Sequence, residues 1–120
     1  MTIQRTETSR RMSQAVRAGN TIYIAGQLAY DNQFADAKTQ TTEILDRIDR
    51  LLAVHGANRE NLVSATVWLS DIRYFHEINE VWDAWVPEGH APGRACIESK
   101  IAFDGYKIEI QAIAYLSSDA

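Results

Sequence analysis

The sequence has little of the chemistry that several functional classes require. Its 120 residues contain a single cysteine, Cys96, which excludes an internal disulfide and fits a reducing compartment. No apolar stretch approaches the roughly 18 residues of a membrane span, and the first ten residues, MTIQRTETSR, have no apolar signal core. We therefore expect a cytoplasmic protein without a membrane partner.

Positive charge and metal-ligand patterns are also scarce. The formal net charge is −4, and the densest basic cluster is the pair Arg10–Arg11. Because nucleic-acid binding needs a clustered basic surface, we expect no nucleic-acid partner. His55 and His90 have no partners at metal-ligand spacing, and the run HEINE that starts at His76 lacks the second histidine of a zinc helix. We expect neither a metal nor a phosphate-cradling glycine loop.

Size and composition fit one small globular unit. A single domain over residues 1–120 is expected, with 46% hydrophobic and 23% charged residues. A chain of this length buries only about two-thirds of the surface that its unfolded form exposes. Self-association would therefore add useful burial.

The first half of the chain predicts a hairpin followed by a helix. Segment 13–27, SQAVRAGNTIYIAGQ, has the pattern of two strands joined at Gly19-Asn20, a pair that accepts the positive φ values of a tight turn. Apolar residues then recur at spacings of three and four over about 36–55, which indicates a helix. Gly56 is a natural stop for it.

The second half predicts one more helix between strands. A β-branched strand over 62–69 leads to a helix that starts after Ser70-Asp71 and has the apolar stripe Phe75, Ile78, Trp82 and Trp85. Two strands follow over 94–103 and 106–116. The order is ββαβαββ, an α+β arrangement. Right-handed crossovers place both helices on one face of a mixed sheet. Partner subunits are the simplest cover for the other face.

The C-terminal third carries the most specific pattern. The run APGRACIESKIAFDGYKIEIQAIA places Pro92, Gly93 and Arg94 fifteen residues ahead of the strand Ile108-Glu109-Ile110. This run resembles the signature of the reactive-intermediate deaminase (Rid) family, also called YjgF, of enamine/imine deaminases. Segment 13–27 resembles the opening hairpin of that family, and FHEINEVWDAWV resembles its second helix.

The resemblance implies a fold, an assembly and a reaction. The fold is chorismate-mutase-like, and three copies form a homotrimer with clefts between subunits. Family members hydrolyse 2-aminoacrylate-type enamines or imines, such as 2-iminobutanoate and 2-iminopropanoate, to 2-keto acids and ammonia without a cofactor. The alternative is a trimeric module that binds small carboxylic or keto acids without turning them over.

Arg94 is the predicted anchor of the substrate carboxylate. A planar guanidinium can hold a carboxylate through two parallel hydrogen bonds, and the resemblance assigns Arg94 this task. The alternative is a structural arginine paired with a glutamate across the trimer. Either role requires a partner for its charge.

Glu109 is the predicted catalytic carboxyl group. Imine hydrolysis requires a proton at nitrogen and water at carbon, and one carboxyl group can serve both steps. Strand alternation turns Glu109 away from Ile108 and Ile110, and desolvation would raise its pKa. The alternative is an ion-pair partner inside the subunit interface.

Four further residues are predicted to line the substrate site. Cys96 should face the same cleft as Arg94, as a packed thiol rather than a nucleophile, because the sequence places no histidine or lysine to activate it. Asn79 matches a family position near the ligand, although a helix–helix or helix–loop hydrogen bond would explain it too. Gly26 matches a glycine whose amide approaches substrate, or it simply ends a strand. Met12 replaces the usual tyrosine and offers no hydroxyl group, which favours the binding module.

Overall fold

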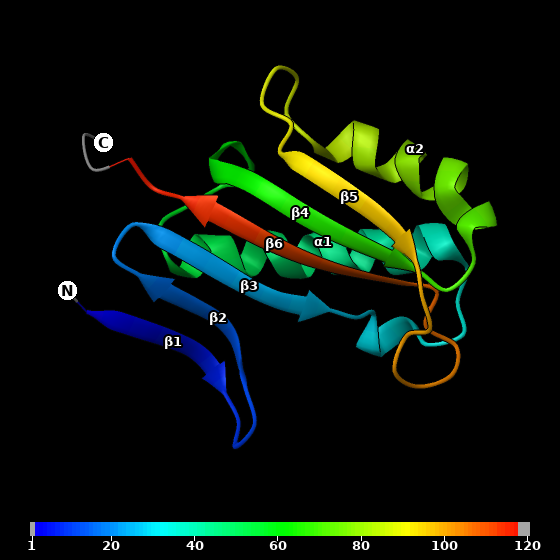
Figure 1. Cartoon of the computed structure of the whole chain (residues 1–120), viewed down its shortest axis with the longest axis horizontal. Coiled ribbons are helices and arrows are strands. Elements are labelled where there is room, and N and C mark those ends of the chain that lie inside the picture. Colours follow the sequence, from blue (N-terminus) through cyan, green and yellow to red (C-terminus); the bar gives the residue numbers. More distant parts are fainter. Residues whose placement is uncertain (1, 118–120) are drawn as a thin grey trace.

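The computed structural model describes residues 2–117, which form one mixed sheet with two helices (Figure 1). The strands are β1 (Ile3–Thr8), β2 (Ser13–Ala18), β3 (Thr21–Gln27), β4 (Leu62–Leu69), β5 (Gly93–Glu98) and β6 (Ile108–Tyr115), and the helices are α1 (Ala37–Val54) and α2 (Phe75–Trp85). Across the sheet the order is β1-β2-β3-β6-β4-β5. Strand β5 is parallel to β4, and the other neighbouring pairs are antiparallel.

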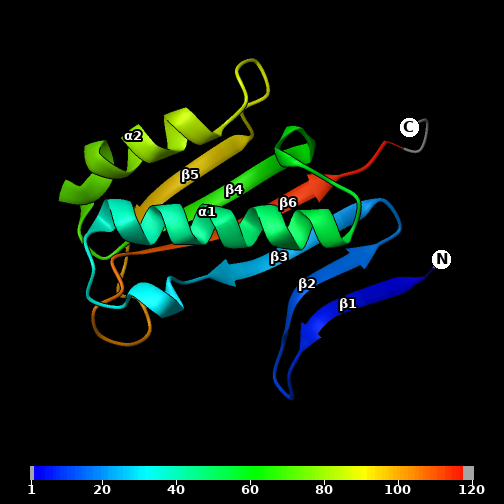
Figure 2. The same ribbon diagram turned by 180° about the vertical axis from the view of Figure 1, so that it is seen from behind.

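Both helices cover the same face of the sheet, as predicted. Strands β3 and β4 each run antiparallel to β6 and are therefore parallel to each other, so β3–α1–β4 and β4–α2–β5 are successive crossover units. They step across the sheet in the same direction, and a common right-handed crossover puts α1 and α2 on one side. Figure 2 shows α1 and α2 on that side of the strands.

The helix and hairpin boundaries follow local chemistry. Asp36 caps α1 by accepting a hydrogen bond from the Thr39 amide at 2.7 Å, and Gly56 leaves the helix with φ of 76°. The β2–β3 turn is the predicted one, but Gly19 alone supplies its positive φ (60°), since Asn20 is not among the residues with positive φ. The expected α1, α2, β2, β3, β4 and β6 are confirmed.

The sheet has one strand more than the sequence predicts. Strand β1, which extends the sheet beyond β2, is nearly all exposed and has no alternating apolar face to reveal it. Contacts to α1 help to hold it: the Thr6 hydroxyl lies 2.8 Å from Nε2 of His55, and Glu7 pairs with Arg50. The observed order is therefore βββαβαββ.

The strand expected over 94–103 is shorter than predicted. Strand β5 ends at Glu98, and the chain leaves the sheet after Ser99, whose amide bonds the Leu69 carbonyl at 2.9 Å. Phe103 and Gly105 then take positive φ values, outside the β region of backbone conformations. The intervening loop is long because β4 lies between β5 and β6 in the sheet.

The second face of the sheet carries no helix within residues 2–117 (Figure 1). Register and strand alternation place Tyr23, Ile97 and Tyr115 on this face, and their exposures are 49%, 46% and 49%. Trp68 lies on it as well and is partly buried. We call this the open face of the sheet. An apolar surface of this kind is typical of a protein–protein contact.

Candidate functional site

Strand β5 is an edge strand that turns Arg94 and Cys96 toward helix α2. Arg94 pairs with Ala65 and Cys96 with Val67 on β4, and both of these partners are buried against the helices. Paired residues share a face of the sheet. Arg94 and Cys96 therefore project to one side, as the sequence predicts.

Two aromatic rings of α2 flank the Arg94 guanidinium. Its central carbon lies 5.1 Å from the ring centroid of Trp82 and 5.8 Å from that of Phe75. Both distances are within the range of a cation–π contact. Sequence reasoning assigned Phe75 and Trp82 only to the apolar stripe of α2, because nothing in the sequence gives the register of this helix against β5.

The side chain of Arg94 forms no hydrogen bond or ion pair with another residue in the range 2–117 that the structure describes. Its Nη1 atom is buried and has no partner. The side chain as a whole is partly buried. A guanidinium in this state can bind an anion, because its N–H donors form no hydrogen bonds to other side chains.

Asn79 lies on α2, the helix that carries Phe75 and Trp82, and has an unpaired hydrogen-bond acceptor. Its Oδ1 atom is buried without a hydrogen-bond partner in the described part of the chain. The Oδ1 atom therefore takes no part in a helix–helix or helix–loop hydrogen bond within residues 2–117. Arg94 and Asn79 are the residues with buried, unpartnered side-chain atoms among those described.

The Cys96 thiol is not prepared for nucleophilic attack. Burial raises its pKa, and the charge of Arg94 opposes this shift with a smaller effect. The thiol form therefore predominates near neutral pH, as expected for a packed wall residue.

Glu109 lies on the open face, away from Arg94 of the same chain. Its neighbours Ile108 and Ile110 are fully buried on the helix side, and Glu109 pairs with Trp68 across β4. Desolvation raises the pKa of the Glu109 carboxyl, which matches the prediction. Such a group exchanges protons at a higher pH than an ordinary glutamate.

Gly26 is in direct contact with Glu109. A Cβ atom at position 26 would overlap the carboxylate oxygen Oε2 of Glu109 and lie 3.0 Å from its Cδ. The interpretation of Gly26 as a strand terminator is wrong, since β3 continues to Gln27. Gly26 is also absent from the glycines with positive φ, so the close approach of Glu109 is what requires a glycine.

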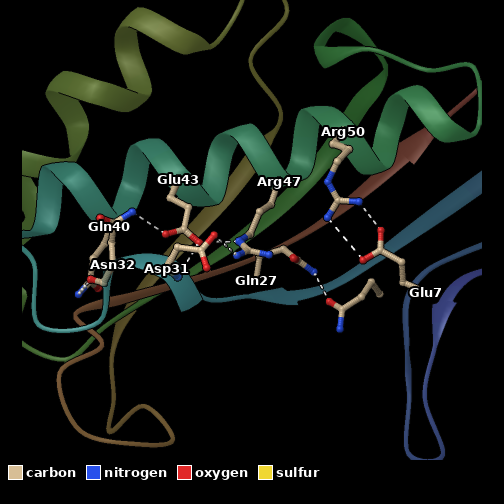
Figure 3. A network of polar contacts seen from close by, with 9 residues as sticks. Glu7, Gln27, Asp31, Asn32, Gln40, Glu43, Arg47 and Arg50 are labelled. Carbon is tan, nitrogen blue, oxygen red and sulfur yellow. Dashed lines mark hydrogen bonds and ion pairs between the residues drawn. The ribbon is translucent and has the colours of Figure 1, made fainter.

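Gln27, which sequence reasoning did not single out, supports this part of the sheet. It is 1% exposed, and its side-chain amide donates to Oε1 of Gln14 and to the Ala25 carbonyl. Figure 3 also draws a separate set of polar contacts, in which Arg47 of α1 bonds Glu43 on the same helix and Asp31 in the segment before it. Each of these arginine and glutamine donors has a partner, which distinguishes them from Arg94.

The remaining predicted residue, Met12, lies at the β1–β2 edge of the sheet, far from the β5 edge that carries Arg94. It sits in the β1–β2 turn, 42% exposed, where its carbonyl accepts from the Ser9 amide. Strand β5 is at the opposite edge. One chain therefore brings together Arg94, Cys96 and Asn79, and separately Gly26 and Glu109, while Met12 is remote from Arg94.

Two cavities of about 460 Å³ each lie elsewhere on the chain. One is lined by the loop before β6 and the other by the segment after α1, and neither includes Arg94 or Glu109. In the part of the chain that the structure describes, no three His, Cys, Asp or Glu side chains come together as metal ligands. Neither α1 nor α2 has the length and hydrophobicity of a membrane-spanning helix.

The sequence matches a family model described as Endoribonuclease L-PSP over residues 2–116. It is similar to a RutC family protein of Haemophilus influenzae, with 40% identity over 114 residues that cover 95% of this chain and 98% of the relative. The RutC family protein YoaB of Escherichia coli is 39% identical with the same coverage.

Solved structures of similar proteins have the same fold as this chain. A crystal structure from Pseudomonas aeruginosa superposes with a TM-score of 0.93 at 36% identity, covering 97% of this chain and 100% of that one. A member of the YjgF protein family from Neisseria meningitidis gives 0.90 at 34% identity, covering 98% of each chain.

Proposed function

Since this chain belongs to the YjgF/RutC (Rid) family, whose model is described as Endoribonuclease L-PSP, we propose that it is a cofactor-independent enamine/imine deaminase. Its substrates would be small 2-imino acids and their 2-enamine tautomers, and its products 2-keto acids and ammonia. The observation that carries this proposal is Arg94, a partly buried guanidinium without an acidic partner in residues 2–117.

Arg94 would fix the substrate by its carboxylate. Two parallel N–H donors of one guanidinium hold a carboxylate in a defined plane. Cys96, on the same side of β5, would wall the site with a neutral thiol, and the substrate then needs only to place its imine carbon near a source of water.

Glu109 would transfer the protons. Desolvation raises its pKa, so the carboxyl group holds its proton to a higher pH than an ordinary glutamate, and in the protonated form it can donate to the imine nitrogen. The resulting carboxylate accepts a proton from the water that adds to the imine carbon. The carboxyl group passes this proton to the amino nitrogen of the carbinolamine, and the C–N bond breaks as the hydroxyl oxygen forms the C=O bond of the keto acid. The hydroxyl proton returns to the carboxylate, and ammonia leaves. An enamine substrate is first protonated at carbon to give the imine.

A homotrimer would bring Arg94 and Glu109 into one cleft. Arg94 lies on the edge strand β5 and Glu109 on the open face, so one chain does not place them side by side. If the β5 edge of one copy packs against the open face of the next, Arg94 of one subunit meets Glu109 and Gly26 of its neighbour. Met12 could line the same cleft. Such packing would also cover the half-exposed Tyr23 and Tyr115.

We do not propose ribonuclease activity, although the family model is named for one. The net charge is −4 and the basic residues do not form a cluster, whereas RNA binding depends on phosphate neutralisation. Arg47, Arg50, Arg59 and Arg73 are each committed to a carboxylate.

The test measures the decay of a reactive substrate with and without this protein. The substrate is an imino acid generated in situ by an amino-acid oxidase, or 2-aminoacrylate released by a dehydratase. The protein should accelerate ketone formation, and Arg94→Ala should lower kcat/KM by at least about a hundredfold because charge-assisted hydrogen bonds are lost. Arg94→Lys should lose most of the activity, since an ammonium cannot bind a carboxylate bidentately.

Arg50→Ala is the matched control, because Arg50 lies on α1 and pairs with Glu7. It should keep the wild-type rate. Full activity in a folded Arg94→Ala variant would contradict the assigned anchor. No acceleration by the wild type, with a keto acid still bound, would favour the non-catalytic binding module, which the lack of a hydroxyl group at Met12 also favours.

A further inference from the structure

We infer that helix α2 positions Arg94 with neutral groups alone: Phe75 and Trp82 hold the guanidinium through their rings, and the Asn79 amide accepts its inner N–H. This inference rests on the proposed function and assigns Asn79 a role different from substrate contact. Asn79 would be a positioning residue that leaves the positive charge of Arg94 uncompensated. That charge is then available to the substrate carboxylate.

The spacing along α2 supports a common face for the three residues. Asn79 follows Phe75 by four positions and precedes Trp82 by three, which are the intervals that bring side chains together on a helix. Phe75 and Trp82 both contact the Arg94 guanidinium. Asn79, between them, must therefore lie on the side of α2 that faces β5.

The two unpartnered atoms have complementary hydrogen-bonding roles. Nη1 of Arg94 is a donor and Oδ1 of Asn79 is an acceptor, and both are buried. Leaving either atom unpaired in a buried site is costly. A hydrogen bond between the two atoms would satisfy both at once, and it would fix one edge of the guanidinium while leaving its other donors to the substrate.

Arg59 in the same chain shows what an acidic partner does. Its guanidinium carbon lies 4.9 Å from the ring of Trp85, and its Nε and Nη2 each donate to one carboxylate oxygen of Asp49 at 2.9 Å. The contact of Arg59 with Trp85 resembles that of Arg94 with Trp82. In Arg59, however, the Asp49 carboxylate occupies the two parallel N–H donors Nε and Nη2. An arginine held in this way has no free fork for a second carboxylate.

The difference between the two arginines therefore lies in one side chain. Position 79 carries an amide, which accepts a hydrogen bond without neutralising the charge. An aspartate there would form an ion pair with Arg94 like that of Asp49 with Arg59. This predicts that a one-atom change, Asn79→Asp, closes the anchor to substrate while improving its fit within the subunit.

The experiment compares folding stability and ligand binding in the full-length protein. Thermal melting gives the stability, and titration calorimetry with 2-oxobutanoate gives the affinity for a small keto acid. Asn79→Asp should melt at or above the wild-type temperature and bind the keto acid at least about tenfold more weakly, because the introduced carboxylate competes for the same charge-assisted hydrogen bonds. A purely structural role for Asn79 would not raise stability and lower affinity together.

Asn20→Asp is the control, since it adds the same charge in the β2–β3 turn, and it should leave the affinity unchanged. Phe75→Leu provides a second measurement that does not depend on the folding of the Asn79 variant. It should weaken keto-acid binding by roughly two- to thirtyfold, the range of one cation–π contact.

The outcomes separate this inference from the proposed function. Wild-type affinity in Asn79→Asp or in Phe75→Leu would overturn the positioning role while leaving Arg94 as the anchor. Failure of the wild-type protein to bind or convert any small 2-keto or 2-imino acid would instead overturn the proposed function itself, together with this inference.

Discussion

At the residue scale, Glu109 depends on Gly26 for its position. The carboxylate occupies the space that any side chain at position 26 would need. Burial next to the strand backbone also raises the pKa of Glu109. The glycine thus leaves room for the carboxyl group, and both this position and the raised pKa would matter for the proposed proton transfer.

Gly26→Ala should displace Glu109 and lower kcat/KM by roughly tenfold to a hundredfold, since a shift of about 1 Å in a catalytic group has such an effect. The melting temperature should change little, because the overlapping atoms belong to the end of a flexible side chain. Steady-state kinetics and thermal melting measure the two quantities.

The control for this prediction is the same substitution in a Glu109→Ala background. The overlapping carboxylate is then absent, so Gly26→Ala should add no further loss of activity. Equal losses in both backgrounds would show that Gly26 acts independently of Glu109.

The sequence predicted these residues unevenly. Arg94 and Glu109 were predicted through the family resemblance, and strand alternation correctly put Cys96 on the side of Arg94 and turned Glu109 away from Ile108 and Ile110. Gly26 was found, but its physical reason was not, because the contact with Glu109 joins two strands that are far apart in the chain. Phe75 and Trp82 were seen only as apolar positions, since helix spacing shows which residues share a face but not what packs against it.

At the scale of elements, α1 is the most regular part of the fold. Its N-cap is Asp36, whose side chain accepts from the Thr39 amide. This hydrogen bond lowers the pKa of Asp36. A group with a lowered folded-state pKa stabilises the fold above its ordinary titration range, and the effect is lost as pH falls through the folded-state pKa.

Asp36→Ala should lower the melting temperature by a few degrees at neutral pH, because it leaves the Thr39 amide without its capping acceptor. The difference from wild type should disappear in acid, where Asp36 is protonated in both states. Thermal melting as a function of pH checks this. Asp83→Ala, on the exposed side of α2, should show no such difference, and an equal effect of both variants would contradict the capping role.

The elements that were predicted have strong local signals, and those that were missed do not. Both helices show apolar spacing and Asp36 caps α1, whereas α2 has no side-chain cap. Strands β4 and β6 have apolar faces. Strand β1 has none, because it is held by backbone pairing to β2 and by contacts such as Thr6 with His55. The end of β5 was missed because ESKIAF remains apolar enough for a strand, while the chain leaves the sheet to cross to β6.

At the scale of the whole molecule, the proposed site requires more than one chain. Arg94 projects to the helix side from the β5 edge, whereas Glu109 lies on the open face. No local pattern in the sequence reveals such a separation, since it follows from the order of strands in the sheet. A homotrimer reconciles the two positions, and light scattering should then give a mass near three times 13.5 kDa.

Complementation between two inactive variants tests the shared site most directly. Arg94→Ala and Glu109→Ala subunits, unfolded together and refolded as mixed trimers, should regain about a quarter of wild-type activity, because random assembly makes that share of the interfaces intact. Each variant refolded alone should remain inactive. Mixed trimers that stay as inactive as the separate variants would contradict a site built from Arg94 of one subunit and Glu109 of the next.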